Sequence, residues 1–264
     1  MTHFGHFSED CRLIRETAPL IHNITNYVAM EISANALLAV GASPLMSSEP
    51  EEMEEIVRLS SALVINIGCL EQRQVKAMMM AAETAQKLGK PWVLDPAGAG
   101  ASRLRTDTAM ELLRRFRPSV FRGNASEVMA LAGAGVRPRG VDSTEDSLSA
   151  LKYAQSIASE FNTIVSVSGP VDRITDGKET VTIGNGSPLM PKVTAMGCTA
   201  SAITAAFLAV DDDPLSAASC AMALMGTAGE TAAALSSGPG SMAVNFIDTL
   251  HNLKPEDAFQ MIRS

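Results

Sequence analysis

The sequence has 264 residues, 46% of them hydrophobic, and a formal net charge of −8 at pH 7. This length and composition suit a large buried core, and because no linker-like stretch divides the chain we expect a single domain over residues 1–264. The acidic balance argues against a nucleic-acid-binding surface, which needs clustered Lys and Arg side chains. No basic helix and no apolar run of about 20 residues indicates membrane contact.

The first residues are polar and charged and lack the apolar stretch of a secretion signal, so we expect a cytoplasmic protein. The four cysteines form no Cys-x-x-Cys pair, and disulfides are rare in that compartment. Each cysteine is therefore expected to be a free thiol. The four histidines are too scattered along the chain to indicate a zinc site.

Strand-length apolar runs alternate with helix-length amphipathic runs through the first two-thirds of the chain. After a small-residue helix at 27–40, the runs that are short, β-branched and apolar on both alternations predict buried strands at 63–68, 92–96, 119–124 and 163–169. Between and around these strands, helices are predicted at 74–88, 107–116, 126–133 and 145–161. Strand followed by helix, repeated, predicts a parallel sheet covered by helices on both faces.

The last third of the sequence has a different organisation. A hairpin is predicted at 172–186 with Asp176-Gly177 at its turn, and the chain is expected to be helical from Cys198 onward. Asp213 followed by Pro214 fits a helix N-cap with proline at the first helical position. We therefore interpret the acidic run at 211–213 as a helix start and not as a metal site.

Each predicted strand ends in a polar, glycine-containing segment. These segments are Asp95 to Gly98, Arg122 to Asn124, and Ser168-Gly169. The carboxyl ends of parallel strands share one edge of a sheet, and ligands bind at that edge. Residues that are distant in the sequence are thus expected to converge there.

Two of these segments allow both a structural and a functional interpretation. Asn124 and Glu127 fit a capping box for the helix that follows, and Asp95 before proline fits a turn. Alternatively, Arg122 is a cation at the ligand edge, Asn124 and Glu127 hold magnesium through waters, and Asp95 is a second carboxylate at the same edge. Two carboxylates, an arginine and glycine-rich turns are what a magnesium–nucleotide site requires.

The segment around Cys198 allows two interpretations as well. A turn containing Gly197 that leads into a helix exposes free N–H groups and the positive end of the helix dipole, which together bind anions. The same dipole is expected to lower the pKa of the Cys198 thiol. The alternative is a small core cysteine beside a tight turn.

Taken together and in order, these segments resemble the hydroxyethylthiazole kinase family, the ribokinase-like enzymes of thiamine salvage. The resemblance covers almost the whole chain, through residues 19–46, INIG at 65–68, LDPAGAG at 94–100, RGNASE at 122–127, TDG at 175–177, MGCTAS at 196–201 and SGPGS at 237–241. It implies a three-layer αβα fold with a mostly parallel central sheet. It further implies transfer of the ATP γ-phosphate to the primary alcohol of 4-methyl-5-(2-hydroxyethyl)thiazole, a requirement for Mg²⁺, and a homotrimer with active sites at subunit interfaces.

The resemblance also implies roles for individual residues. In ribokinase-like enzymes an aspartate at the head of this helix takes the alcohol proton; thiazole kinases have cysteine there, which is Cys198 in this chain. Gly197 and its neighbours would offer N–H groups to the moving phosphoryl group. The remaining implied contacts are the nucleotide at Arg122 and Ser168, magnesium at Asp95 and Glu127, and the thiazole at Met46 and Ala195 with Asn26 nearby.

The sequence departs from the family pattern at three positions. Ala195 and Met196 stand where the family usually has glycine and threonine, and alanine costs about 1 kcal/mol or more if that position is left-handed. Ser168 replaces a usual threonine and keeps its hydroxyl.

Three alternatives for the function remain open. The substrate of the kinase could be a related alcohol such as hydroxymethylpyrimidine. Cys198 could be the nucleophile of a hydrolase or transferase with His22 as its base. The protein could also bind its ligands without turnover. The helices at 27–40 and 214–235 could pack within one subunit and not between subunits.

Overall fold

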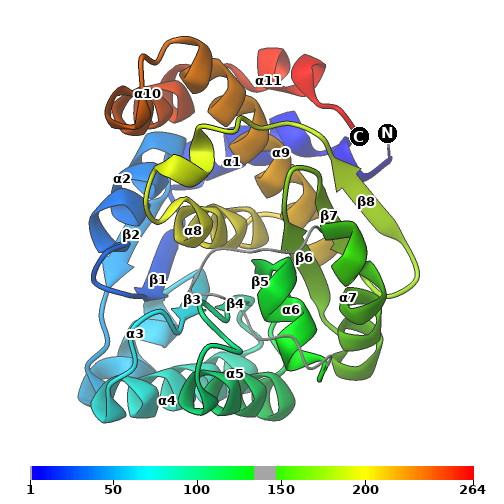
Figure 1. The fold of residues 1–264 in the computed structure, drawn as a ribbon. Helices are drawn as coiled ribbons and strands as arrows, with labels where there is room; N and C mark the ends of the chain where they lie inside the picture. The colour runs from blue at the N-terminus through cyan, green and yellow to red at the C-terminus, as the bar shows by residue number, and fades with distance from the viewer. Residues whose placement is uncertain (1, 134–146) are drawn as a thin grey trace.

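The computed structural model describes residues 2–133 and 147–264, which form one eight-stranded sheet with helices on both faces (Figure 1). The strands lie in the order β2-β1-β3-β4-β5-β6-β7-β8. Pairing is parallel from β2 through β6 and antiparallel for β7 and β8. Their bounds are β1 Leu20–Ile24, β2 Ser43–Met46, β3 Ala62–Asn66, β4 Trp92–Asp95, β5 Val120–Asn124, β6 Ile164–Ser168, β7 Asp172–Thr175 and β8 Thr180–Ile183.

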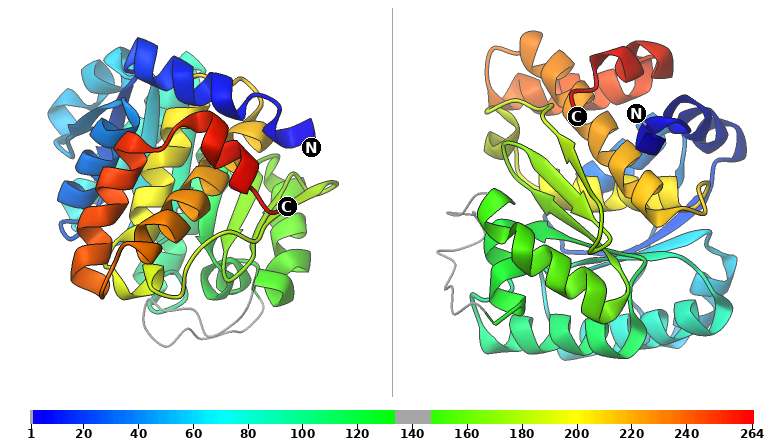
Figure 2. Two further views of the ribbon diagram at one scale, coloured as in Figure 1. Left: turned by 90° about the horizontal axis from the view of Figure 1, so that it is seen from above. Right: turned by 90° about the vertical axis from the view of Figure 1, so that its right-hand side faces the viewer.

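Two helical layers cover the sheet (Figure 2). Side chains alternate along the strands, so Val64 and Val93 join one core cluster while Leu63 and Leu94 join the other. The first layer holds α1 Phe7–Thr17, α2 Met30–Val40, α8 Met196–Leu208, α9 Pro214–Ala234, α10 Pro239–Asn252 and α11 Pro255–Met261. The second holds α3 Met53–Leu59, α4 Gln72–Leu88, α5 Arg103–Phe116, α6 Ala125–Leu131 and α7 Ser147–Phe161. The expected three-layer αβα fold with a mostly parallel sheet is confirmed.

Most predicted elements are present with small shifts at their ends. The four predicted buried strands are β3 to β6, and the helices predicted around them are α4 to α7; residues 145 and 146 of the last prediction lie outside the described residues. The hairpin is β7–β8, where Asp176 Oδ1 accepts hydrogen bonds from the backbone N–H groups of Lys178 and Glu179. Asp213 caps α9 by accepting from Leu215 N, as predicted.

The sequence pattern does not predict strands β1 and β2 or helices α1 and α3. β1 is buried, but His22 and Asn23 interrupt its apolar pattern. β2 contains Pro44, which is tolerated because β2 lies at the edge of the sheet. The small-residue helix expected at 214–235 is α9, which packs inside the core of this chain.

The connections place the carboxyl ends of the parallel strands along one edge. From β1 the chain continues to β2 on one side, and then returns to β3 on the other side, which makes a topological switch point between β1 and β3. At this edge Asn66 is opposite Asp95 in the register, and Asn124 is opposite Ser168. In the part of the chain that is described, no helix has the length and apolar character needed to cross a bilayer.

Candidate active site

The first turn of α8 places Cys198 at this edge, against the ends of β1 and β3. Asn26, just after β1, donates from Nδ2 to Cys198 Sγ at 3.3 Å. Asn66, the last residue of β3, donates from Nδ2 to the same sulfur at 3.2 Å. Asn26, which the resemblance placed near the thiazole, therefore contacts Cys198. Asn66, which the sequence analysis did not single out, completes the contact.

The pKa of Cys198 differs from the sequence-based expectation. Burial, and next the nearby charge of Asp95, raise the pKa of the thiol to about 12. The hydrogen bonds from Asn26 and Asn66 and the charge of Arg122 act in the opposite direction but do not compensate. The expected lowering by the helix dipole is therefore wrong, because burial outweighs the favourable helix end. The thiol is neutral at physiological pH.

Ala195 has the left-handed backbone that the sequence analysis considered. It is the N-cap of α8 with φ of 61° and accepts a hydrogen bond from Thr199 N at 2.9 Å. This conformation costs an alanine about 1 kcal/mol relative to glycine. The turn is formed nevertheless, and the first amides of α8 remain without intrahelical partners, as at any helix start.

Arg122 lies beside the first turn of α8. A Cβ added at Gly197 would lie 3.6 Å from Arg122 Nη1, and Arg122 Nη2 donates to Ser168 Oγ at 2.5 Å. Only 5% of the arginine is exposed, and its Nε has no hydrogen-bond partner within residues 2–133 and 147–264. The structure thus brings the two residues expected to contact nucleotide together, next to the anion-binding end of a helix.

Asp95 and Glu127 are both buried near this arginine. Asp95 Oδ2 accepts from Ser201 Oγ at 2.7 Å, and burial raises the pKa of Asp95 although Arg122, Ser201 and Asn66 oppose the shift. Burial, and next the charge of Asp95, raise the pKa of Glu127 to about 7. Two carboxylates with raised pKa values at a ligand edge are typical of a functional site.

Glu127 also has the structural role that the sequence indicated. Its Oε2 accepts from Asn124 N at 2.8 Å in a complete capping box of α6, and its Oε1 accepts from Gly98 N at 2.8 Å. Glu127 therefore caps α6 and also lies close enough to Asp95 to feel its charge. Within residues 2–133 and 147–264, no group of three or more His, Cys, Asp or Glu side chains has the arrangement of a metal site. Mg²⁺ commonly uses only one or two carboxylates together with water and substrate phosphates, and this pair fits that requirement.

Comparison with known proteins decides the family. A family model described as the hydroxyethylthiazole kinase family matches residues 11–256. The chain belongs to the hydroxyethylthiazole kinase family. A hydroxyethylthiazole kinase from Brachyspira hyodysenteriae is 52% identical to it over 250 residues, which are 95% of this chain and 94% of the relative.

Solved structures agree with this assignment. The structure of hydroxyethylthiazole kinase protein from Pyrococcus horikoshii matches with a TM-score of 0.90 and 41% identity over 97% of each chain. A ribokinase-like superfamily protein from Enterococcus faecalis shares the fold alone, with a TM-score of 0.66 and 15% identity over 89% of this chain and 88% of that one. The fold of this hydroxyethylthiazole kinase family member is therefore ribokinase-like.

His22 is the candidate base in the alternative in which Cys198 is a nucleophile, but it does not contact Cys198. It is fully buried in β1, its Nε2 is 3.0 Å from Ser47 O, and burial lowers its pKa. The hydrogen-bond donors on Cys198 Sγ among the described residues are Asn26 and Asn66. The structure therefore does not form the Cys198–His22 pair that thiol nucleophilic catalysis would use. Met46, expected near the thiazole, is half-buried at the end of β2 and opposite Asn23 in the register.

Arg105 is a further residue that the sequence analysis missed. From α5 its Nη1 donates to Ile67 O and Ala97 O, both at 2.8 Å, and its Nη2 donates to Gly68 O at 2.9 Å. The guanidinium thus holds together the loops that follow β3 and β4. Gly98, at φ of 79°, leaves room for the arginine side chain, since an added Cβ would lie 3.2 Å from Arg105 Cδ.

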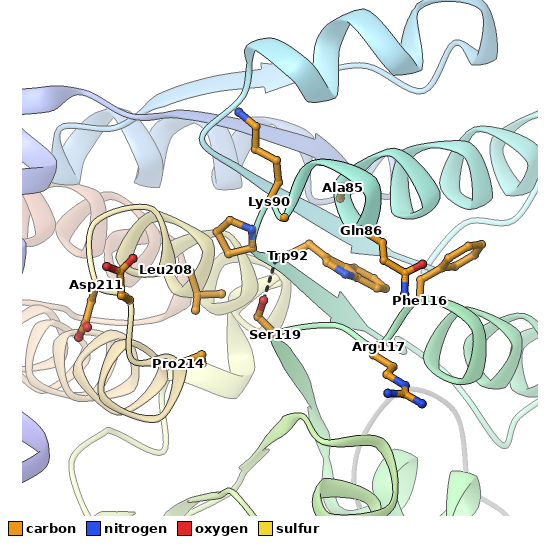
Figure 3. Close-up of a pocket in the computed structure, with 13 residues that line it drawn as sticks. Ala85, Gln86, Lys90, Trp92, Phe116, Arg117, Ser119, Leu208, Asp211 and Pro214 are labelled. Atoms are coloured by element: carbon orange, nitrogen blue, oxygen red, sulfur yellow. Dashed lines mark hydrogen bonds between the residues drawn. The ribbon is translucent and has the colours of Figure 1, made fainter.

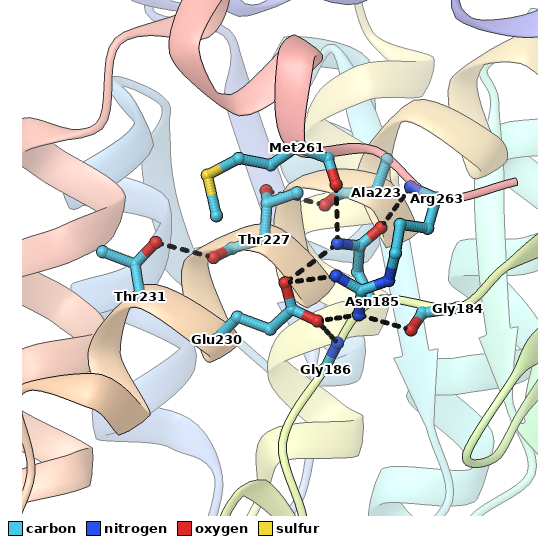
Figure 4. Close-up of polar contacts among 9 residues, drawn as sticks. All are labelled: Gly184, Asn185, Gly186, Ala223, Thr227, Glu230, Thr231, Met261 and Arg263. Atoms are coloured by element: carbon cyan, nitrogen blue, oxygen red, sulfur yellow. Dashed lines mark hydrogen bonds and ion pairs between the residues drawn. The ribbon is translucent and has the colours of Figure 1, made fainter.

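The segment between β8 and α8 is anchored from the C-terminal part of the chain (Figure 4). Glu230 on α9 accepts from Asn185 Nδ2 and Gly186 N, both at 3.0 Å, and pairs with Arg263. Arg263 N donates to Asn185 Oδ1 at 2.7 Å. Gly226 permits the approach, because an added Cβ would lie 2.6 Å from Asn185 Cβ. These contacts fix the position of the segment that leads from β8 to Ala195 and Cys198.

A depression on the described part of the protein lies at the opposite edge of the sheet (Figure 3). It measures about 380 Å³ and is lined by Trp92 and Ser119 at the amino ends of β4 and β5 and by Leu208 at the end of α8. Lys90, which also lines it, already donates to Arg58 O at 3.1 Å and Ser60 O at 2.5 Å. None of the expected site residues lines this depression, and we do not assign the active site to it.

Proposed function

We infer that the chain is a hydroxyethylthiazole kinase that transfers the γ-phosphate of ATP to the primary alcohol of 4-methyl-5-(2-hydroxyethyl)thiazole, for thiamine biosynthesis. Membership of the family supports the reaction. The observation that carries the assignment of the site is the position of Cys198 at the start of α8, between two asparagine amides and beside Arg122. A hydroxymethylpyrimidine alcohol is the alternative substrate.

We propose that Arg122, Ser168 and the first amides of α8, including that of Gly197, bind the phosphates. The guanidinium and the positive helix end both favour the negative charge that develops on the transferred group. The unpartnered Nε of Arg122 is a donor that phosphate oxygens would satisfy. Because phosphoryl transfer has a loose transition state, these charge contacts supply most of the stabilisation.

Cys198, in its thiolate form, is proposed to accept the alcohol proton as the alcohol oxygen bonds to the γ-phosphorus and the bond from that phosphorus to the bridging oxygen breaks, releasing ADP. Its pKa of about 12 means that few molecules hold a thiolate at neutral pH. A loose transition state needs little deprotonation of the alcohol before attack, so a weakly populated base suffices. Asn26, Met46 and Ala195 are proposed to contact the thiazole, since Asn26 contacts the Cys198 sulfur and Ala195 begins the same helix.

Asp95 and Glu127 are proposed to hold Mg²⁺ through water and phosphate oxygens. Bound Mg²⁺ would neutralise the charge of the phosphates. Both carboxylates are buried, and the charge of Asp95 contributes to the raised pKa of Glu127, so a cation between them would relieve an unfavourable interaction. Titration of the protein with Mg²⁺ in the presence of ATP, repeated with Glu127→Gln, tests this assignment.

A single domain, a homotrimer with active sites at subunit interfaces, and a cytoplasmic location complete the proposal. Tyr27 and Val28 directly follow Asn26 and are 61% and 64% exposed, so the site is bordered by apolar side chains that a second subunit could cover. The described cysteines are all free, in agreement with a reducing compartment. Sedimentation analysis distinguishes a trimer from a monomer.

The reaction is tested by incubating the protein with ATP, Mg²⁺ and the thiazole alcohol and measuring the phosphate ester by mass spectrometry. A parallel incubation with hydroxymethylpyrimidine decides between the two substrates. Formation of the thiazole ester at the higher kcat/KM supports the proposal. Absence of the thiazole ester at high enzyme concentration would overturn it, and would leave a protein that binds without turnover.

A further inference from the structure

Asn66 shares its amide between the sulfur of Cys198 and two neighbouring donors. Its Nδ2 donates to Cys198 Sγ at 3.2 Å, and its Oδ1 accepts from Asn26 Nδ2 at 3.0 Å and from Gly68 N at 2.8 Å. An amide group turned by 180° would place its NH₂ against both of these donors. The orientation of Asn66 is therefore determined by its surroundings, and the group facing the sulfur is an N–H donor.

The backbone around Asn66 is built for this convergence. Asn66 is fully buried at the end of β3, on a strand with neighbours on both sides, so its side chain has a rigid support. An added Cβ at Gly68 would lie 2.7 Å from Asn26 Nδ2 and 2.8 Å from Asn66 Oδ1. Any other residue at position 68 would displace one of the two amides. The glycine thus allows both asparagines to reach the same sulfur atom.

We propose that Asn66 is a positioning residue that, with Asn26, holds Cys198 Sγ in place and stabilises negative charge on it; this rests on the proposed role of Cys198 as the acceptor of the alcohol proton. A hydrogen bond to a charged acceptor is stronger than one to a neutral acceptor. The two amides therefore favour the thiolate over the thiol. They oppose the burial and the Asp95 charge that favour the thiol.

A purely structural alternative is that Asn66 only closes the turn after β3 through Gly68 N. The variant Asn66→Asp separates the two roles, since its carboxylate can still accept from Gly68 N and Asn26 Nδ2 but puts an oxygen where the donor faced the sulfur. Asn66→Ala removes both contacts, together with the hydrogen bond by which Asn66 lowers the pKa of Asp95. Asn23→Ala is the matched control, because Asn23 is a buried asparagine near the end of β1 whose Nδ2 donates to Ile21 O.

The test is a double-mutant cycle between positions 66 and 198, with kcat and the KM for ATP measured for each variant. In the wild-type background we expect Asn66→Ala and Asn66→Asp to lower kcat by about 10- to 100-fold with little change in the KM for ATP. In a Cys198→Ala background the same substitutions should lower kcat by no more than about twofold, since residues acting through one group are not additive. Asn23→Ala should have the same effect in both backgrounds.

A readout without catalysis accompanies the cycle. The infrared S–H stretching band of Cys198, assigned by difference from Cys198→Ala, should shift in both Asn66 variants and remain in place in Asn23→Ala. An unshifted band, or equal kcat losses for Asn66→Ala with and without Cys198, would overturn the proposal while ester formation by the wild type stands. Absence of ester with the wild type defeats the proposed function instead, and the infrared comparison still decides whether Asn66 contacts the thiol.

Discussion

The guanidinium of Arg122 on β5 donates a hydrogen bond to the hydroxyl of Ser168 at the end of β6, with Nη2 and Oγ 2.5 Å apart. The contact links two neighbouring strands, and a Cβ added at Gly197 in the first turn of α8 would lie 3.6 Å from Arg122 Nη1, so each residue fixes the other at the proposed phosphate-binding edge.

This pairing predicts that the hydroxyl at position 168 matters and its methyl group does not. Ser168→Thr should keep the affinity for ATP, whereas Ser168→Ala should weaken it by about 5- to 10-fold because one hydrogen bond to a charged group is lost. The dissociation constant of ATP from isothermal titration calorimetry is the measurement. Equal affinities of the alanine and threonine variants would show that Ser168 does not orient Arg122.

Cys198→Asp should retain or increase kcat, because a carboxylate is ionised at neutral pH, whereas a thiol depends on neighbouring groups to stabilise its thiolate. In the wild type, kcat should rise from neutral to mildly alkaline pH, because below a pKa of about 12 the thiolate fraction grows with pH. The aspartate variant should lack this slope. A loss of all activity in Cys198→Asp, with the fold intact by circular dichroism, would indicate covalent thiol chemistry instead.

Ala195→Gly should stabilise the protein by about 1 kcal/mol, because glycine adopts the left-handed conformation without the steric cost that alanine has. Ala200→Gly, one turn later in α8, is the control and should destabilise by about 1 kcal/mol, as glycine does inside a helix. Chemical denaturation gives both free energies of unfolding. If Ala195→Gly is destabilising, the left-handed turn is not a source of strain.

Asp10→Asn should raise the free energy of unfolding at mildly alkaline pH. Burial, and next the charge of Asp211, raise the pKa of Asp10 from 3.8 to about 7, so the folded state retains a proton that the unfolded state releases. The contribution of Asp10 is therefore fully present below its unfolded pKa and is lost as the pH rises through its folded pKa. Asparagine, which does not titrate, removes that part of the pH dependence.

Asp212→Asn serves as the control, because Asp212 is exposed and follows Asp211 in the sequence. It should leave the dependence of stability on pH unchanged. Thermal denaturation of the three proteins across acid to mildly alkaline pH gives the comparison. Identical pH profiles for the wild type and Asp10→Asn would contradict the assignment of the titrating group.

The sequence predicted the strands that are apolar on both alternations and missed β1. The reason is that His22 and Asn23 interrupt the apolar run of β1. Both are nevertheless buried, because His22 pairs with Ser47 O and Asn23 with Ile21 O, and a hydrophobic pattern does not reveal such hydrogen bonds. Conversely, β3 to β6 were found because their burial on both faces requires continuous apolar runs.

Positions in the candidate site could be predicted where motifs are local and were missed where contacts are distant. Arg122, Ser168 and Cys198 lie at strand ends and a helix start, which are visible within a few residues, while their roles remain predictions that came from the family resemblance. Arg105 lies on a helix rich in surface charge, and only the folded structure shows that its guanidinium turns back to three carbonyl groups. The raised pKa of Cys198 could not be predicted because it depends on how deeply the folded chain buries the thiol, and the sequence left a reactive and a buried cysteine both open.

The network of Glu230, Asn185 and Arg263 bears on the order in which the molecule folds. Asn185 and Arg263 are 78 residues apart in the sequence, yet they anchor the segment that carries Ala195 into α8. Contacts between residues so far apart in the sequence form late, because the entropy cost of closing a long loop comes before the contact stabilises the fold. The candidate site should therefore be complete, and able to bind ATP, only after α9 to α11 have docked.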